Sequence, residues 1–229
     1  MPEAGLSRLA ARVFGRFSKH DPMDAHRAGP LSRDRRKACQ LQEALLMTRD
    51  VPGAIVECGV ASGTSLSLIA HAVRRSGDDR TIIAVDSYEG FPPLSEQDAD
   101  WFDPDTMKLH YKRFDVEFVT SNLLASGLTE AEVATVTFAK GWIPEVLDRV
   151  QGPLSLLHLD VDLYQPYADS LRILWPMLSS GGWVLLDEYD QGRDVEKWPG
   201  AKKAIDEFCS AQGITVKKHW TGFAHLVKP

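Results

Sequence analysis

The sequence predicts an α/β fold, built as a single doubly wound, mostly parallel sheet with helices on both faces. Short apolar runs alternate along the chain with amphipathic stretches of helical period. Several of these runs end in acidic residues, at Glu57, Asp86, Asp160 and Asp187. The length of 229 residues suits one domain with a short appendage. Because ligands bind beyond the carboxyl ends of parallel strands, chemistry is expected at those acidic residues.

The expected elements follow from periodicity and from glycine and proline breaks. A helix is predicted over residues 33–49, where Ala38, Leu41, Leu45 and Leu46 recur at helical spacing. Buried or short strands are predicted at 54–58, 81–85, 135–139, 154–159, 183–186, 214–219 and 223–227. Further helices are predicted near 65–75, 115–126, 167–178 and 199–211, a long loop over 87–113, and a turn at 180–182. Residues 1–49 are interpreted as a helical lid or oligomerisation segment, and residues 50–229 as the main domain.

Composition and charge exclude some classes of binding partner and indicate the cellular compartment. The formal net charge of −6 argues against nucleic acid. Three separated cysteines fit a reducing, cytoplasmic compartment, and no apolar run reaches the roughly 20 residues of a membrane span, so stable membrane insertion is not expected. The basic, amphipathic residues 5–19 are predicted to pack on their own domain or to form a homodimer contact; a lipid contact or a targeting role is the alternative.

A glycine-containing loop follows the first predicted strand. Small residues at Gly59, Ser62 and Gly63 let the backbone turn sharply and approach a ligand closely. The loop opens a helix whose free N–H groups favour an anion. Its spacing is GxxxG rather than the GxGxxG of dinucleotide sites, which favours a carboxylate as the bound group. Asp86, after the second strand, is placed to accept hydrogen bonds from ribose hydroxyls; a loop anchor is its alternative role.

Four carboxylates follow two neighbouring strands. Asp160 and Asp162 leave the strand at 154–159, and Asp187 and Glu188 leave the strand at 183–186. Neighbouring strands lie about 5 Å apart, so these side chains should converge. Hard oxygen ligands at this density suit Mg²⁺ or a similar divalent cation. The alternative is that they cap helices or pair with arginine or lysine.

At these motifs a family resemblance emerges. The segments ECGVASG, DSYEGFP, FAKGW, HLDVDLY and LLDEYD, in this order, resemble the macrocin O-methyltransferase family, whose members methylate sugar hydroxyls in natural-product biosynthesis. The resemblance covers about residues 50–210 and implies a class I, S-adenosylmethionine-dependent methyltransferase fold. The chain departs from the family pattern at Val161, Pro166 and Glu188, where Gly, a small hydroxyl residue and Asp are usual.

The resemblance implies a metal-dependent O-methyltransferase that moves a methyl group from S-adenosylmethionine to a hydroxyl of a small molecule, with a sugar as the expected acceptor. Asp162 would be the general base, and Asp160, Asp187 and Glu188 would bind Mg²⁺ or a similar cation. The cofactor would be held by Glu57, Gly59, Val60, Ser62, Gly63, Ser65, Asp86, Ser87, Gly141, Trp142 and Asp160. Asn122 also matches a family position, without an assigned role.

Two other function classes stay open: an NAD(P)-dependent Rossmann oxidoreductase, and a non-catalytic nucleoside-binding α/β protein. The basic run Arg35–Lys37 is interpreted as a solvated helix face. Three histidines are alternative bases or hydrogen-bonded core residues: His158, His219 and His225. Loop aromatics are candidates for an acceptor pocket: Trp101, Phe102, His110 and Tyr111.

Overall fold

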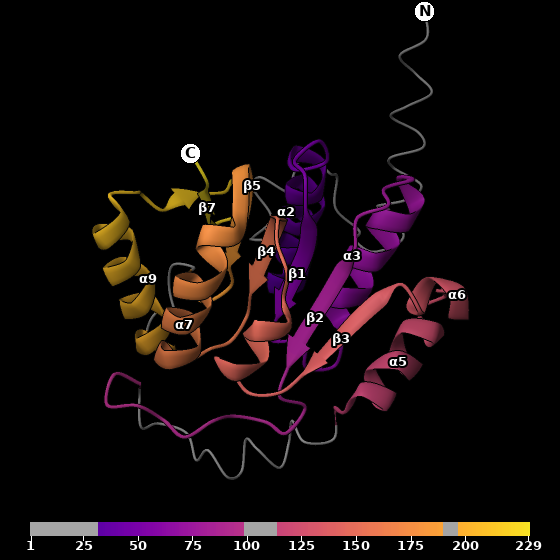
Figure 1. Ribbon diagram of the computed structural model, residues 1–229, viewed down its shortest axis with the longest axis horizontal. Coiled ribbons are helices and arrows are strands. Elements are labelled where there is room, and N and C mark those ends of the chain that lie inside the picture. Colours follow the sequence, from indigo (N-terminus) through magenta and orange to yellow (C-terminus); the bar gives the residue numbers. More distant parts are fainter. Residues whose placement is uncertain (1–31, 99–113, 190–196) are drawn as a thin grey trace, which may run out of the picture. The chain divides into compact units, whose positions relative to one another are not determined.

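The computed structural model describes residues 32–98, 114–189 and 197–229 (Figure 1). Residues 37–229 form one compact unit; of the separate unit 1–36, only residues 32–36 are described. The lid or oligomerisation role given to residues 1–49 therefore stays a prediction. The four loop aromatics, between residues 101 and 111, also lie outside the described residues.

The described residues contain one seven-stranded sheet with the order β3-β2-β1-β4-β5-β7-β6. The strands are β1 (Ala54–Cys58), β2 (Ile82–Asp86), β3 (Val136–Lys140), β4 (Leu154–Leu159), β5 (Leu178–Leu186), β6 (Lys217–Lys218) and β7 (Ala224–Val227). Strands β1 to β5 pair in parallel, whereas β7 runs antiparallel to β5 and to β6. The predicted doubly wound, mostly parallel sheet is confirmed.

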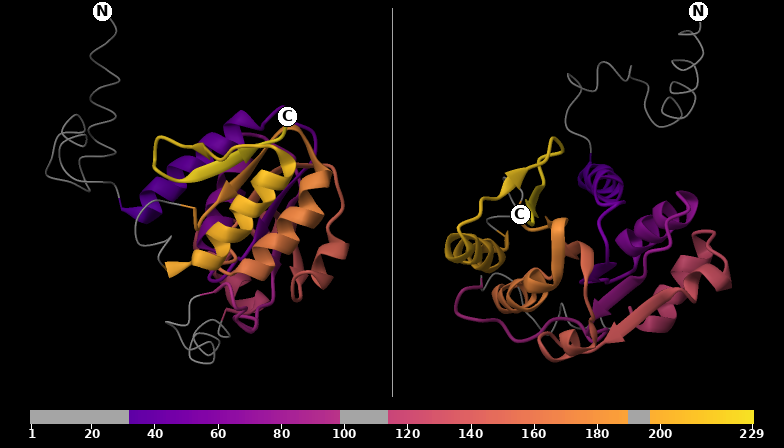
Figure 2. Two further views of the ribbon diagram at one scale, coloured as in Figure 1. Left: turned by 90° about the vertical axis from the view of Figure 1, so that its left-hand side faces the viewer. Right: turned by 45° about the horizontal axis from the view of Figure 1, so that its top comes forward.

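Helices cover both faces of this sheet. Helices α7 (Tyr164–Leu174) and α9 (Pro199–Gln212) lie side by side on one face, as Figure 2 shows. The other face packs against α2 (Arg33–Met47), α3 (Thr64–Arg75) and α5 (Val116–Ala125), whose apolar residues form a separate core cluster. Shorter helical segments are α6 (Glu130–Val133), η2 (Glu145–Arg149) and η3 (Trp175–Met177).

Burial on both faces explains the continuous apolar runs that predicted the strands. In β1, Ile55 packs into the cluster beside α2 and α3, and Val56 packs into the cluster beside α7 and α9. In β4, Leu156 packs into the cluster beside α2 and α3, and Leu157 packs into the cluster beside α7 and α9. Successive side chains of a strand point to opposite faces, so a strand covered on both sides needs apolar residues at every position.

Three local expectations differ from the structure. The predicted turn at 180–182 lies inside β5, where the register with β4 shifts and Gly181 has φ +80°. Helix α7 begins at Tyr164, because the Asp98 carboxylate accepts a hydrogen bond of 2.8 Å from the Tyr164 N–H. Leu46, placed on the apolar face of the first helix, is 68% exposed.

The order of the strands places two loops next to each other. The chain crosses from β1 to β2 and β3, and then returns to add β4 on the other side of β1. The carboxyl ends of β1 and β4 therefore flank the topological switch point, where α/β sheets bind their ligands. Among the described residues, none of the helices combines the length and apolar character needed to cross a membrane.

Candidate active site

The loop after β1 turns through glycines in the left-handed region. Gly59 has φ +88° and Gly63 has φ +82°, conformations that glycine adopts readily. A Cβ atom on Gly59 would lie 1.8 Å from the carbonyl oxygen of Asp160. The loop therefore runs directly against the backbone at the end of β4. Helix α3 starts at Thr64, so its first free N–H groups lie at the same sheet edge.

Asp86, at the end of β2, holds this loop. Its Oδ2 accepts hydrogen bonds from the N–H groups of Val60 (2.7 Å) and Ala61 (3.1 Å). Its Oδ1 accepts one from the N–H of Tyr88 at 2.7 Å. A carboxylate offers about four acceptor positions, so the three backbone bonds leave room for a hydroxyl. The anchoring role is thus observed, and the predicted ribose contact is compatible with it.

The other residues predicted around the nucleoside lie at the same end of β2 and β3. The Ser87 hydroxyl donates to the Gly90 carbonyl at 2.9 Å and so closes the turn after β2. The Gly141 N–H donates to the Asp86 carbonyl at 3.0 Å, and Trp142 follows it. Their contacts with a nucleoside stay predictions.

Asn122 gains a structural role. Its side-chain amide donates to the carbonyl of Ser62 at 2.9 Å and ties α5 to the glycine loop. The Ser62 and Thr64 hydroxyls lie 3.0 Å apart at the start of α3, where Ser65 is buried. The loop that would hold the methionine end of the cofactor is therefore fixed from α5 as well as from β2.

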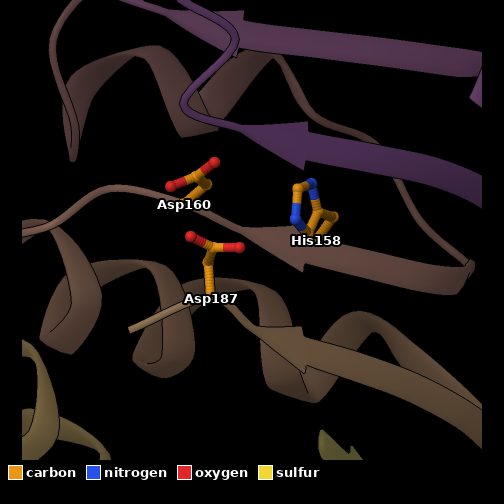
Figure 3. Close-up of side chains that lie close together, drawn as sticks. All are labelled: His158, Asp160 and Asp187. Carbon is orange, nitrogen blue, oxygen red and sulfur yellow. The ribbon is translucent and has the colours of Figure 1, made fainter. Parts of the chain in front are cut away.

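The acidic residues after β4 and β5 converge. Potential ligand atoms of Asp160, Asp162 and Glu188 lie within 4.8 Å of one another, as do those of His158, Asp160 and Asp187. Figure 3 shows the second group: His158 on β4, Asp160 just beyond that strand, and Asp187 facing it from the end of β5. The three predicted metal ligands thus divide between two groups that share Asp160.

Lys37 of α2 reaches into this cluster. Its Nζ is hydrogen-bonded to Asp160 Oδ2 and lies 3.0 Å from Asp187 Oδ1. The side chains of Lys37 and Asp187 are only 15% and 3% exposed. Burial by itself would lower the pKa of Lys37, but the neighbouring Asp160 and Asp187 carboxylates raise it above the ordinary value. Lys37 is therefore a charged ammonium within the cluster.

Asp162 occupies an unusual backbone conformation. Its φ is +59°, and the N–H of Leu163 donates to the carbonyl of Val161 at 2.6 Å across it. Such tight turns at non-glycine residues gather at functional sites. Burial, followed by the negative charges of Asp160 and Asp187, raises the pKa of Asp162 well above its usual range, whereas Lys197 and Lys37 oppose this shift.

Glu188 is buried beside Tyr167 of α7. The Tyr167 hydroxyl is hydrogen-bonded to Glu188 and to the Leu159 carbonyl, the latter at 2.8 Å. Burial, and then the charges of the three aspartates, raise the pKa of Glu188 above its usual range, and the hydrogen bond with Tyr167 opposes this shift. A bound cation would favour the charged form instead.

Glu57 and His158 form a buried pair between β1 and β4. Glu57 Oε1 lies 2.9 Å from His158 Nδ1, and both side chains are almost inaccessible. Among the described residues, Glu57 Oε2 has no hydrogen-bond partner. A buried oxygen left in this state is costly, so a ligand or water contact is expected there.

Lys37 differs from its sequence-based prediction. The interpretation as part of a solvated helix face is wrong, because Lys37 precedes the buried Gln40, Leu41 and Ala44 at helical spacing. That spacing was a usable signal, but the run of basic residues around it obscured it. His219 and His225 lie instead in and beside the hairpin of β6 and β7.

The fold and the site together define a class I S-adenosylmethionine-dependent methyltransferase. The solved structure of the O-methyltransferase NovP is similar, with a TM-score of 0.68 and 25% identity over 84% of this chain and 79% of that one. The family model described as macrocin O-methyltransferase (TylF) matches residues 9–221. The chain belongs to this family of O-methyltransferases.

Curated relatives agree with the family. A tetracenomycin-C 4'-O-methyltransferase from Streptomyces olivaceus is 33% identical over 78% of this chain and 70% of its own length. Demethyldecarbamoylnovobiocin O-methyltransferase from Streptomyces niveus is 31% identical over 69% of this chain, but the match spans only 59% of that relative. These matches favour methyl transfer over the oxidoreductase interpretation.

Proposed function

We propose that this protein transfers the methyl group of S-adenosylmethionine to a sugar hydroxyl of a glycosylated natural product, assisted by a divalent cation. The observation that carries the proposal is the direct contact between the glycine loop after β1 and the acidic cluster that begins at Asp160 after β4. Gly59, in the cofactor loop, has no room for a side chain against the Asp160 carbonyl, and the Asp160 N–H donates to the Cys58 carbonyl at 2.9 Å. The methyl donor and the acidic cluster would therefore meet at one point.

The acceptor class comes from the relatives. The name of the Streptomyces olivaceus relative describes a dimethoxy-α-L-rhamnosyl group on tetracenomycin C. Another relative, from Micromonospora griseorubida, is named mycinamicin III 3''-O-methyltransferase, with 29% identity. We extend this class, a hydroxyl on a sugar that decorates a larger scaffold, to the present chain.

The donor set fits a divalent cation. Carboxylate oxygens are the ligands that Mg²⁺ prefers, and this cluster already holds the Lys37 ammonium. Asp160, Asp187 and Glu188 would hold the ion, with Asp162 in the same group as Asp160 and Glu188. A bound divalent cation would make a nearby sugar hydroxyl more acidic.

The chain's own residues then position the reaction and accept the proton. Methyl transfer is an in-line displacement: the acceptor oxygen bonds to the methyl carbon while the carbon–sulfur bond breaks, so the main task is orientation. The loop 59–65 and Asp86 would fix the donor. The Asp162 carboxylate would accept the hydroxyl proton as general base, and its position beside Asp160 suits this role.

The proposal is tested with purified protein, S-adenosylmethionine and a panel of rhamnosylated aromatic glycosides with their aglycones. We expect methylated glycoside by mass spectrometry, loss of turnover in EDTA, and recovery with Mg²⁺. Replacing the base, Asp162→Asn, should lower kcat by roughly 10²- to 10⁴-fold while S-adenosylmethionine affinity stays unchanged.

Asp148→Asn is the matched control, since Asp148 is an exposed carboxylate on η2. It should leave kcat unchanged. Methylation of the aglycone alone would contradict the sugar acceptor, and undiminished turnover in EDTA would contradict the metal. Cofactor binding without any methylated product would favour the non-catalytic alternative.

A further inference from the structure

A cation of the chain itself already lies inside the acidic cluster. Lys37 Nζ is hydrogen-bonded to Asp160 and lies 3.0 Å from Asp187 Oδ1; the Asp187 side chain is buried, and those of Lys37 and Asp160 are partly buried. An ion pair in such a place is strong because little solvent screens it, and breaking it leaves unpaired buried charge. The lysine therefore compensates two carboxylates that would otherwise repel each other.

A divalent cation would need the same oxygens. Mg²⁺ holds its oxygen ligands at about 2.1 Å, inside the distance that separates Lys37 from Asp187. An ammonium between the two carboxylates fills that point and repels a second positive charge. Lys37 and a divalent ion therefore compete for the Asp160 and Asp187 carboxylates.

We propose that Lys37 is a tethered counter-cation that holds the acidic cluster together in the metal-free protein and is displaced when a divalent ion binds. The inference rests on the divalent site of the proposed function. A lysine suits this role because its ammonium is a compact point charge on a flexible four-carbon stem. The stem starts on α2, whose next turns are anchored in the core by Leu41 and Ala44, so the ammonium can withdraw without moving the helix.

Competition of this kind weakens metal binding. An ion that takes Asp160 Oδ2 or Asp187 Oδ1 must first break a contact of Lys37, so its observed affinity would be lower than that of the bare carboxylates. The lysine also lets the cluster form without metal, because its charge offsets part of the repulsion among the acids. Both consequences can be measured without turnover.

The first test measures Mn²⁺ binding to the full chain by titration, with the free ion followed by electron paramagnetic resonance. Lys37→Met should bind Mn²⁺ at least tenfold more tightly than the wild type, because the competing ammonium is gone. Lys203→Met is the matched control: Lys203 is a helical lysine paired with a carboxylate, Glu207, at 3.9 Å on the exposed surface of α9. Its affinity for Mn²⁺ should equal that of the wild type.

Unchanged or weaker Mn²⁺ binding by Lys37→Met would overturn the proposal. If neither protein bound Mn²⁺, the inference and the divalent site would both fall, whereas methyl transfer in EDTA would still support the rest of the proposed function. Wild-type turnover without any metal binding would make Lys37 a permanent cation and would likewise overturn the exchange.

A second test uses the wild-type protein, so it does not depend on how a variant folds. Acylation of lysines is followed by mass spectrometry with and without saturating Mg²⁺. Displacement should expose the Lys37 amine and raise its labelling rate severalfold on metal binding, while Lys203 is labelled at one rate throughout. Equal labelling of Lys37 in both conditions, with the metal bound, would overturn the proposal.

Discussion

Gly59 shows how a single residue joins two parts of the site. Its φ of +88° excludes most side chains, and a Cβ would lie 1.8 Å from the Asp160 carbonyl. Gly59→Ala should cost about 3 kcal/mol of unfolding free energy, from backbone strain together with the clash. It should also weaken S-adenosylmethionine binding, because the loop must move. Denaturant unfolding and calorimetry measure the two effects.

Gly77→Ala is the control for Gly59→Ala. Gly77 also has a positive φ, of +68°, but open space surrounds the position of its Cβ. Gly77→Ala should therefore lose only about 1 kcal/mol, the strain term alone, and should keep full cofactor affinity. Equal losses in the two variants would show that the contact with Asp160 does not constrain the loop.

At the scale of elements, the antiparallel pair of β5 and β7 contains a histidine that should make the free energy of unfolding depend on pH. His225 stacks on Trp183 with 4.2 Å between ring centroids. Burial lowers the pKa of His225 to about 4; His219 and Lys217 add to this shift, and Glu43 opposes it. The folded protein therefore binds this proton less readily than the unfolded chain, whose histidine pKa is about 6.5.

The sign of the effect follows. The free energy of unfolding is unaffected by His225 above about pH 6.5, where the histidine is neutral in both states. It falls as the pH drops towards about 4, by about 2 kcal/mol in total when partial solvent access is allowed for. His225→Phe keeps the stack and should flatten this part of the pH profile of unfolding free energy. Parallel profiles for wild type and His225→Phe would contradict the assignment.

At the scale of the whole molecule, one ligand should stabilise both halves of the sheet. The loop after β1 is held by Asp86 from β2 and lies against Asp160 after β4. S-adenosylhomocysteine at about 100 times its Kd should add about 2.7 kcal/mol. For a chain of this size, Tm should rise by roughly 5–10 °C.

Differential scanning fluorimetry measures this shift, with NADH as the ligand control. Asp86→Ala should lose most of the rise, because the backbone N–H groups of Val60 and Ala61 lose their acceptor. An equal Tm rise with NADH would favour the nucleotide-binding alternatives over the methyl donor.

The sequence predicted the fold and the edge of the sheet at which the acidic residues converge. Apolar runs such as Ala54–Cys58 and Leu154–Leu159 are local signals, and their length and composition mark strands buried on both faces. The acids that follow them mark the strand ends. Motif order along the chain was enough to indicate the family, because its segments are short and contiguous.

Only the tertiary structure decided which charges meet. Lys37 and Asp160 are 123 residues apart, and their contact depends on how α2 packs on the sheet. The pairing of Glu57 with His158 depends in the same way on β1 lying beside β4. Local patterns report which face of an element is buried, but the partner of a buried charge is set by packing between distant segments. For that reason the acidic residues could be predicted from the sequence, whereas the spacing of Lys37 indicated only that it lies on the buried face of its helix and not which charges it meets.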